Sequence, residues 1–222
     1  MTRLILHAVG IDEFRELFSA DQDVTQALRS WAAAAYPPPP PSEKSGWLDR
    51  LGPMTRKNPH PPVIRPDIPS GHDLEDIVHG RDVPPARLPA AWALVDLWLQ
   101  QMAWSSVTLP LTEPLEGIDF AASLAGVPAE RGIGRLLNHQ LALPLRDAPG
   151  QRSGYVRGSH AAAMATSWAA AMPAIQPPDP GFVQEFTRWL TAFSDWTRAA
   201  TTAGRPDPDL IALHRTDATE IS

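Results

Sequence analysis

The chain has 222 residues, of which 43% are hydrophobic and eight are Trp, so it is long and apolar enough to bury a sizeable core. It contains no Cys, which excludes disulfides, thiolate nucleophiles and metal sites built on Cys ligands and favours a reducing compartment. The formal net charge of −6 argues against a non-specific binder of nucleic acid, because that affinity comes mainly from Lys and Arg that neutralise phosphates.

The chain opens with a predicted strand at residues 3–9 and a predicted helix at about 12–19. The apolar stretch at the start is only about six residues long, too short for a secretion signal or a membrane span, so we expect a cytoplasmic protein that does not bind membranes. A second predicted helix, at about 23–35, is stopped by the consecutive prolines of residues 37–41, which favour a polyproline II conformation.

Residues 37–71 contain eleven prolines and no helical or strand period, which predicts a proline-rich extended segment. Such a segment is suited to bind an aromatic groove of a protein partner, and it is equally suited to wrap its own domain. Its basic residues outnumber its acidic ones, five to three. The basic residues are Lys44, Arg50, Arg56, Lys57 and Arg65.

The remaining sequence predicts helices with a few short strands. The most apolar predicted helix, at about 89–104, carries Trp92, Val95 and Leu99 three and four residues apart, and we expect it at the centre of the fold. The other predicted helices lie at about 73–79, 115–125, 128–139, 161–172 and 181–203. The predicted strands lie at about 106–111 and 209–215, with a hairpin of 140–145 and 153–157.

The strands at 3–9 and 209–215 are suited to pair in one sheet, which would tie the two ends of the sequence together. We therefore predict an α+β fold, a mainly helical single domain over residues 1–222 that contains the proline-rich segment. The aromatic residues at helical spacing in 181–203 are interpreted as core, or else as a binding groove or a dimer face. The sequence leaves the oligomeric state open.

Residues His72, Asp76 and His79 form the best candidate for a metal site. If their segment is helical from its start, they fall at i, i+4 and i+7 on one face, and two imidazoles with a carboxylate suit zinc, manganese or ferrous iron. The alternative interpretation is structural: Asp73 caps the helix, Asp76 closes a capping box, and the histidines are half-exposed. The spacing matches no established zinc motif.

Three further places have both a chemical and a structural interpretation. Ser159 lies at a predicted strand-to-helix turn, where it is either a nucleophile or the N-cap of the helix. Asp96 is either a carboxylate with a raised pKa in a tryptophan-rich pocket or, because Gln100 and Gln101 are nearby, part of a wet helix face. His7 and His214 lie on the two terminal strands, where they either meet across the sheet or form ordinary hydrogen bonds.

Four stretches of the chain carry a recognisable pattern: LILHAVGIDEFRELFSA, WLDRLGP, VIRPDIPSGHDLEDIVHGRDVPPARLPAAWALVDLWL and YVRGSHAAAM. Together they resemble an uncharacterised family of small actinobacterial cytosolic proteins, a domain of unknown function, and the resemblance covers most of the chain. More distantly, the strand–helix opening and the VPPARL entry to a long helix look like a YfbM-type domain. The resemblance implies a single domain, a bacterial origin and a cytosolic location, and it carries no catalytic residue across.

The leading functional hypothesis is a non-catalytic accessory or protein-interaction module, with the proline-rich segment and exposed aromatic faces as contact surfaces. The alternative is a metal-dependent hydrolase that acts on a small molecule through His72, Asp76 and His79. Apart from a divalent metal at that site, the sequence indicates no cofactor, and the acidic charge favours no nucleic-acid partner.

Overall fold

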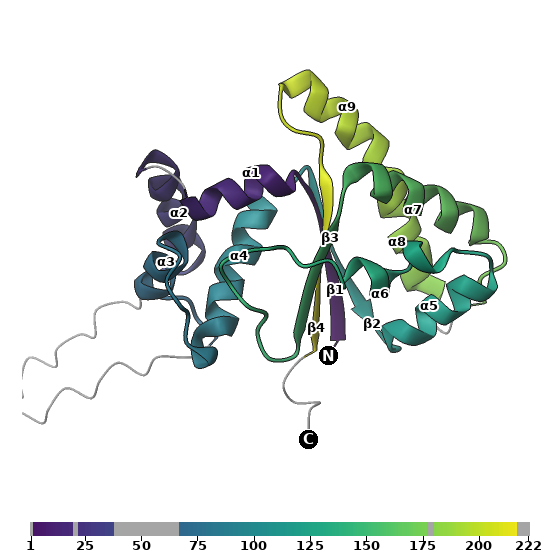
Figure 1. Cartoon of the computed structure of the whole chain (residues 1–222), viewed down its shortest axis with the longest axis horizontal. Coiled ribbons are helices and arrows are strands. Elements are labelled where there is room, and N and C mark those ends of the chain that lie inside the picture. Colours follow the sequence, from purple (N-terminus) through teal and green to yellow (C-terminus); the bar gives the residue numbers. More distant parts are fainter. Residues whose placement is uncertain (1, 20–21, 38–66, 177–179, 217–222) are drawn as a thin grey trace, which may run out of the picture.

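The structure is a computed structural model that describes residues 2–19, 22–37, 67–176 and 180–216. The described residues form one α+β domain around a four-stranded antiparallel sheet (Figure 1), as predicted. Most of the proline-rich segment, residues 38–66, lies outside the described residues. The prediction that this segment is extended therefore falls outside the described residues as well.

The sheet has the strand order β2-β1-β4-β3. Its strands are β1 (Thr2–Val9), β2 (Ser105–Leu111), β3 (Gln151–Val156) and β4 (Asp209–Thr216). The central strands β1 and β4 pair along their whole length, from Thr2 opposite Thr216 to Val9 opposite Asp209. The predicted pairing of the two terminal strands is therefore confirmed.

Helices cover both faces of the sheet, which Figure 1 shows edge-on between them. On one side of the sheet lie α1 (Ile11–Glu16), α2 (Gln22–Ala35), α3 (Gly71–Val78) and α4 (Leu88–Met102), with α2 and α3 packed against α4. The other face packs against α5 (Leu115–Leu124), α6 (Ile133–Leu136), α7 (Gly158–Ala171) and α8 (Pro180–Thr191). Because side chains alternate along a strand, Ile5 and Val9 enter the first core while Leu4 and Leu6 enter the second.

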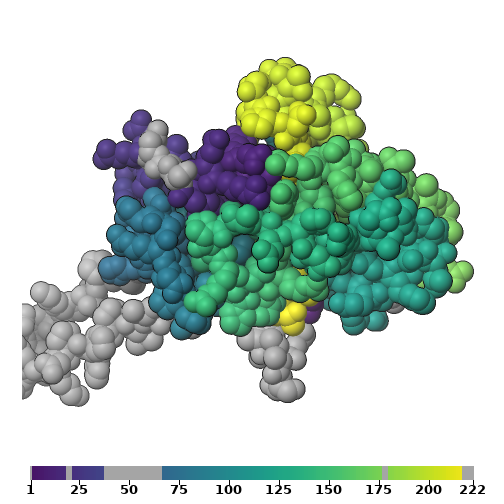
Figure 2. All heavy atoms as spheres, in the orientation of Figure 1, coloured from purple at the N-terminus to yellow at the C-terminus, as the bar shows by residue number. Residues whose placement is uncertain are grey.

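The predicted helix at 181–203 divides at Ala192 into α8 and α9 (Phe193–Ala203). Figure 2 shows α9, in yellow, projecting from the top of the molecule. Trp189 and Trp196 lie on either side of the break with their ring centroids 4.8 Å apart. Most of the aromatic residues of this region are buried, as expected for core.

Two predicted elements differ from the structure more than the helix at 181–203 does. Residues 140–145 form no strand, so the predicted hairpin is wrong, and β3 pairs with β4 instead. The alternating leucines of this segment imitate a strand, but Leu141 is buried against the α1–α4 side and its carbonyl accepts a hydrogen bond from Arg15 Nε at 2.9 Å. The predicted helix at 128–139 is reduced to a short 3-10 turn and α6, because Gly132 separates the two.

The carboxylate of Asp209 joins the starts of two helices at one end of the sheet. Its Oδ2 accepts a hydrogen bond from the Ile11 backbone N–H at 3.0 Å, and its Oδ1 accepts one from the Gly158 backbone N–H at 2.9 Å. These amides begin α1 and α7, which lie on opposite faces of the sheet. Asp209 is only 5% exposed, so both amides would lack a partner without it.

We expect Asp209→Ala to lower the free energy of unfolding by about 2–4 kcal/mol, because two amides at helix starts lose a charged acceptor. Urea unfolding followed by circular dichroism measures this change. The control is Asp207→Ala, which removes an exposed carboxylate two residues earlier and should cost less than about 0.5 kcal/mol. Equal stability losses in the two variants would contradict the assignment.

Candidate functional site

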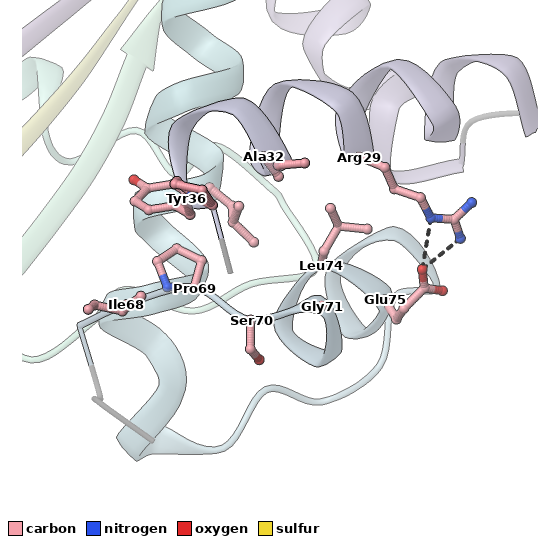
Figure 3. Close-up of a pocket in the computed structure, with 12 residues that line it drawn as sticks. Arg29, Ala32, Tyr36, Ile68, Pro69, Ser70, Gly71, Leu74 and Glu75 are labelled. Atoms are coloured by element: carbon pink, nitrogen blue, oxygen red, sulfur yellow. Dashed lines mark hydrogen bonds and ion pairs between the residues drawn. The ribbon is translucent and has the colours of Figure 1, made fainter. Parts of the chain in front are cut away.

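A pocket of about 540 Å³ lies between α2 and α3, and Figure 3 shows the side chains around it. Its volume is in the range of sites that bind small molecules or clusters of side chains. The walls are mainly apolar, and polar groups lie at the rim. The apolar lining consists of Ala32, Ala33, Tyr36, Pro37, Ile68, Pro69, Leu74 and Leu94.

The start of α3 is held in place by a buried cluster around Asp73. Ser70 is the N-cap of α3, and its backbone N–H and hydroxyl both donate to Asp73 Oδ2, at 2.7 and 2.6 Å. Arg87 binds the same carboxylate through Nε at 2.8 Å and through Nη2. Arg87 Nη2 also donates to the carbonyl of Ile68, at 2.9 Å. These bonds fix one wall of the pocket relative to the segment that leads into α4.

The pKa of Asp73 is lowered by the same hydrogen bonds. Burial alone would raise the pKa of this carboxyl, but the hydrogen bonds from Arg87 and Ser70 outweigh burial and hold the pKa below its ordinary value. The capping box predicted for this helix is therefore present, but it lies one turn earlier than expected. Ser70 is the cap and Asp73 the returning partner, instead of Asp73 and Asp76.

An ion pair closes one end of the pocket. Arg29 of α2 donates from Nε and Nη2 to Glu75 Oε1 of α3, at 3.0 and 2.6 Å, and Figure 3 shows this link across the rim. The hydrogen bond from Arg29 lowers the pKa of Glu75. Because both side chains are partly exposed, the pair contributes at most about 1 kcal/mol to stability.

Tyr36, at the other end of the pocket, lies near a second buried charge cluster. The pKa of Tyr36 is raised, first by burial and then by the negative charge of Asp96, while Arg215 acts in the opposite direction. The phenol therefore stays protonated at neutral pH. Tyr36 thus offers the pocket an aromatic face and a hydroxyl.

Asp96 is the centre of that second cluster, and both predictions for it are wrong. Its side chain is buried rather than on a wet face, since the residue is only 9% exposed. Arg215 Nη1 donates to Oδ2 at 2.8 Å, Gln100 Nε2 donates to Oδ1 at 3.0 Å, and His7 Nε2 lies 3.3 Å from Oδ1. Burial alone would raise the pKa of Asp96, but His7 and Arg215 lower it to about 2.

His7 and His214 do not meet across the sheet, so that prediction is wrong. The register places Ile211 opposite His7 and Leu4 opposite His214. Because side chains alternate between faces, His7 points toward α4 while His214 lies on the other face. Burial, with a smaller effect of Arg152, lowers the pKa of His214. His7 is fully buried, and its Nδ1 lies 2.8 Å from Ser106 Oγ.

The predicted metal ligands His72, Asp76 and His79 all lie on or next to α3, but they do not converge. His79 Nδ1 lies 2.8 Å from the carbonyl oxygen of Glu75, and Asp76 pairs with Arg81 at 3.5 Å. Within the described ranges, no group of three His, Asp or Glu side chains is placed to hold a metal ion. The metal site stays a prediction that this geometry does not favour.

Ser159 is not the N-cap of α7, so its structural interpretation is wrong as well. Arg157 occupies the cap position, and the first amide of the helix, that of Gly158, is bound by Asp209. The first amides of α6 are bound by a carboxylate in the same way. The backbone N–H groups of Ile133 and Gly134 donate to Asp119, at 2.7 and 2.6 Å.

Comparisons with known proteins give no match for this chain, whether with protein-family models, curated proteins or solved structures. The resemblance to an uncharacterised actinobacterial family stays a prediction. Among the helices of the described ranges, none has the length and apolar character that spanning a membrane would require.

We expect the stability contributed by Asp96 to depend on acid pH. Its pKa in the folded state, about 2, lies below the ordinary value, so its contribution is present above about pH 4 and is lost as the pH falls toward about 2. A depression of this size corresponds to about 2 kcal/mol.

Urea unfolding at several pH values measures this loss. The difference in stability between the wild type and Asp96→Asn should shrink by about 2 kcal/mol as the pH falls from about 5 to about 2. Asp82→Asn is the control, because this carboxylate is 89% exposed and its difference from the wild type should stay nearly constant. If the stability difference between the wild type and Asp96→Asn did not change with pH, Asp96 would not be ionised in the folded state, and the prediction would be wrong.

Proposed function

We propose that this chain is an accessory protein-interaction module whose pocket between α2 and α3 receives the apolar side chains of an amphipathic helix from a partner protein. The observation that carries the proposal is the lining of the pocket, where small and apolar side chains from three helices surround about 540 Å³. Grooves between the helices of a protein bind a helix of a partner through the apolar side chains that this helix carries at i, i+3, i+4 and i+7.

The shape of the pocket favours such an occupant. Ala32, Ala33 and Gly71 occupy little space, so the backbones of α2 and α3 are accessible from the groove. Pro37 and Pro69 form stiff parts of the wall, and Tyr36 supplies a large aromatic surface at little entropic cost. A preformed groove of this kind loses little conformational freedom when a partner binds.

Charge complementarity favours an acidic partner. Pro37 and Gly71, which both line the pocket, are the first and last residues of the proline-rich segment. That segment carries five basic residues against three acidic ones, in a chain whose net charge is −6. An acidic helix is therefore attracted to this part of the chain and repelled by the rest.

A pocket-filling substitution tests the groove with anilinonaphthalene sulfonate, an apolar anion whose fluorescence rises on binding. We expect Ala33→Trp to weaken dye binding by about tenfold or more, because the new ring occupies the groove. Ala34→Trp is the matched control, since Ala34 is the next exposed residue of α2 but does not line the pocket. Equal dye binding by the two variants would refute the pocket as a binding site.

Displacement of the dye from the full chain tests the kind of occupant. A synthetic acidic helix with leucines at i, i+3, i+4 and i+7 should displace the dye. The same peptide with Lys in place of each Glu should bind about tenfold more weakly. Dye binding that neither peptide displaces would indicate a small-molecule site and would refute the interaction function.

A further inference from the structure

Ser106, His7 and Asp96 lie next to one another in a line that runs from the surface into the domain. Ser106 lies on the edge strand β2 directly opposite His7 of β1, and its Oγ is 2.8 Å from His7 Nδ1. His7 Nε2 lies 3.3 Å from Asp96 Oδ1 of α4, in an ion-pair contact that is not aligned as a hydrogen bond. The three residues are far apart in the sequence, and the sheet register together with α4 brings them into the order hydroxyl, imidazole, carboxylate.

The surroundings of Asp96 determine which ring nitrogen of His7 carries the proton. Arg215 of β4 and Gln100 of α4 hold the carboxylate by hydrogen bonds, and its pKa of about 2 keeps it ionised at neutral pH. A carboxylate beside Nε2 favours the tautomer with the proton on Nε2. Nδ1 then carries a lone pair and accepts the hydrogen bond from the Ser106 hydroxyl.

Ser106 is accessible while its neighbours in the array are not. Ser106, Thr108 and Pro110 share one face of β2, and all three are exposed, whereas His7 is fully buried and Asp96 nearly so. An exposed hydroxyl above a buried, oriented imidazole is the arrangement in which a general base activates a serine nucleophile. The two ring nitrogens have exchanged roles relative to the usual serine hydrolase triad, but the proton route is the same.

We infer that Ser106 is a nucleophile, with His7 as its general base, toward small phosphonyl and acyl esters. Ser106 Oγ attacks the phosphorus or the carbonyl carbon while its proton passes to His7 Nδ1. With a fluorophosphonate, the P–F bond breaks and fluoride leaves. With an ester, the acyl C–O bond breaks, the alcohol leaves with the proton from His7, and water then hydrolyses the acyl-serine. This activity is separate from the proposed interaction groove.

Labelling of the full chain with a small fluorophosphonate, followed by peptide mass spectrometry, tests the inference. We expect Ser106 to be labelled about 100-fold faster than Ser105, the preceding residue, whose hydroxyl faces Trp189 Nε1 at 3.2 Å and has no imidazole partner. The label should disappear in Ser106→Ala and remain in Ser105→Ala. Wild-type protein whose Ser106 reacts no faster than Ser105 would overturn the inference.

The pH dependence of labelling separates a general base from a purely structural hydrogen bond. The rate should rise with pH and then level off, which is the profile of a reaction that needs an unprotonated general base. The groups that influence His7 are Asp96 and Gln100 on α4, Arg215 on β4, Ser106 on β2 and, through Asp96, Tyr36 at the end of α2. A rate that does not change with pH would overturn the role of His7.

A cysteine substitution provides a second readout, because the chain contains no other thiol. In Ser106→Cys, His7 should stabilise the thiolate, so iodoacetamide should alkylate it about tenfold faster near neutral pH than the thiol of Thr108→Cys. Thr108 is the matched control, since it is exposed on the same face of the same strand. Equal alkylation rates for the two thiols would overturn the inference.

Discussion

The antiparallel ladder between β1 and β4 joins the two ends of the described chain into the centre of one sheet. Each of these strands is apolar on both faces, so the sheet can be stable only if helices cover both sides. The positions of the helices follow from this requirement. Asp209, the first residue of β4, then binds the first amides of one helix on each side, so the strand pairing and the helix starts stabilise each other.

Buried and half-buried carboxylates share one structural role in the described part of the domain, which is to bind backbone amides or arginines. Asp73 orders the start of α3, Asp119 orders the start of α6, and Asp209 orders α1 and α7. Asp119 differs from Asp73 in that no arginine of the described ranges binds it, and burial accordingly raises its pKa. The positions of Asp73, Asp119 and Asp209 are thus explained by the backbone amides and side chains that they bind.

The sequence predicted the sheet centre well because long apolar runs at both ends are conspicuous in the one-dimensional pattern. It predicted Asp96 badly because Gln100 looked like a mark of solvent, whereas Gln100 is itself a partner of the buried carboxylate. The other partner, Arg215, is 119 residues away, and no local pattern reports such a contact. The groove was invisible for the same reason, since α2 and α3 lie on opposite sides of the proline-rich segment.

Asp96 connects the two surfaces to which we assign binding and chemistry. On one side its charge acts on Tyr36 at the end of the groove, and on the other its carboxylate faces the imidazole beneath Ser106. Arg215 limits this coupling, because its positive charge opposes the effect of Asp96 on Tyr36. An occupant that contacts Tyr36 therefore meets a pair of opposite charges rather than a lone carboxylate. We expect the groove and the serine to respond independently to substitutions that leave Asp96 and Arg215 in place.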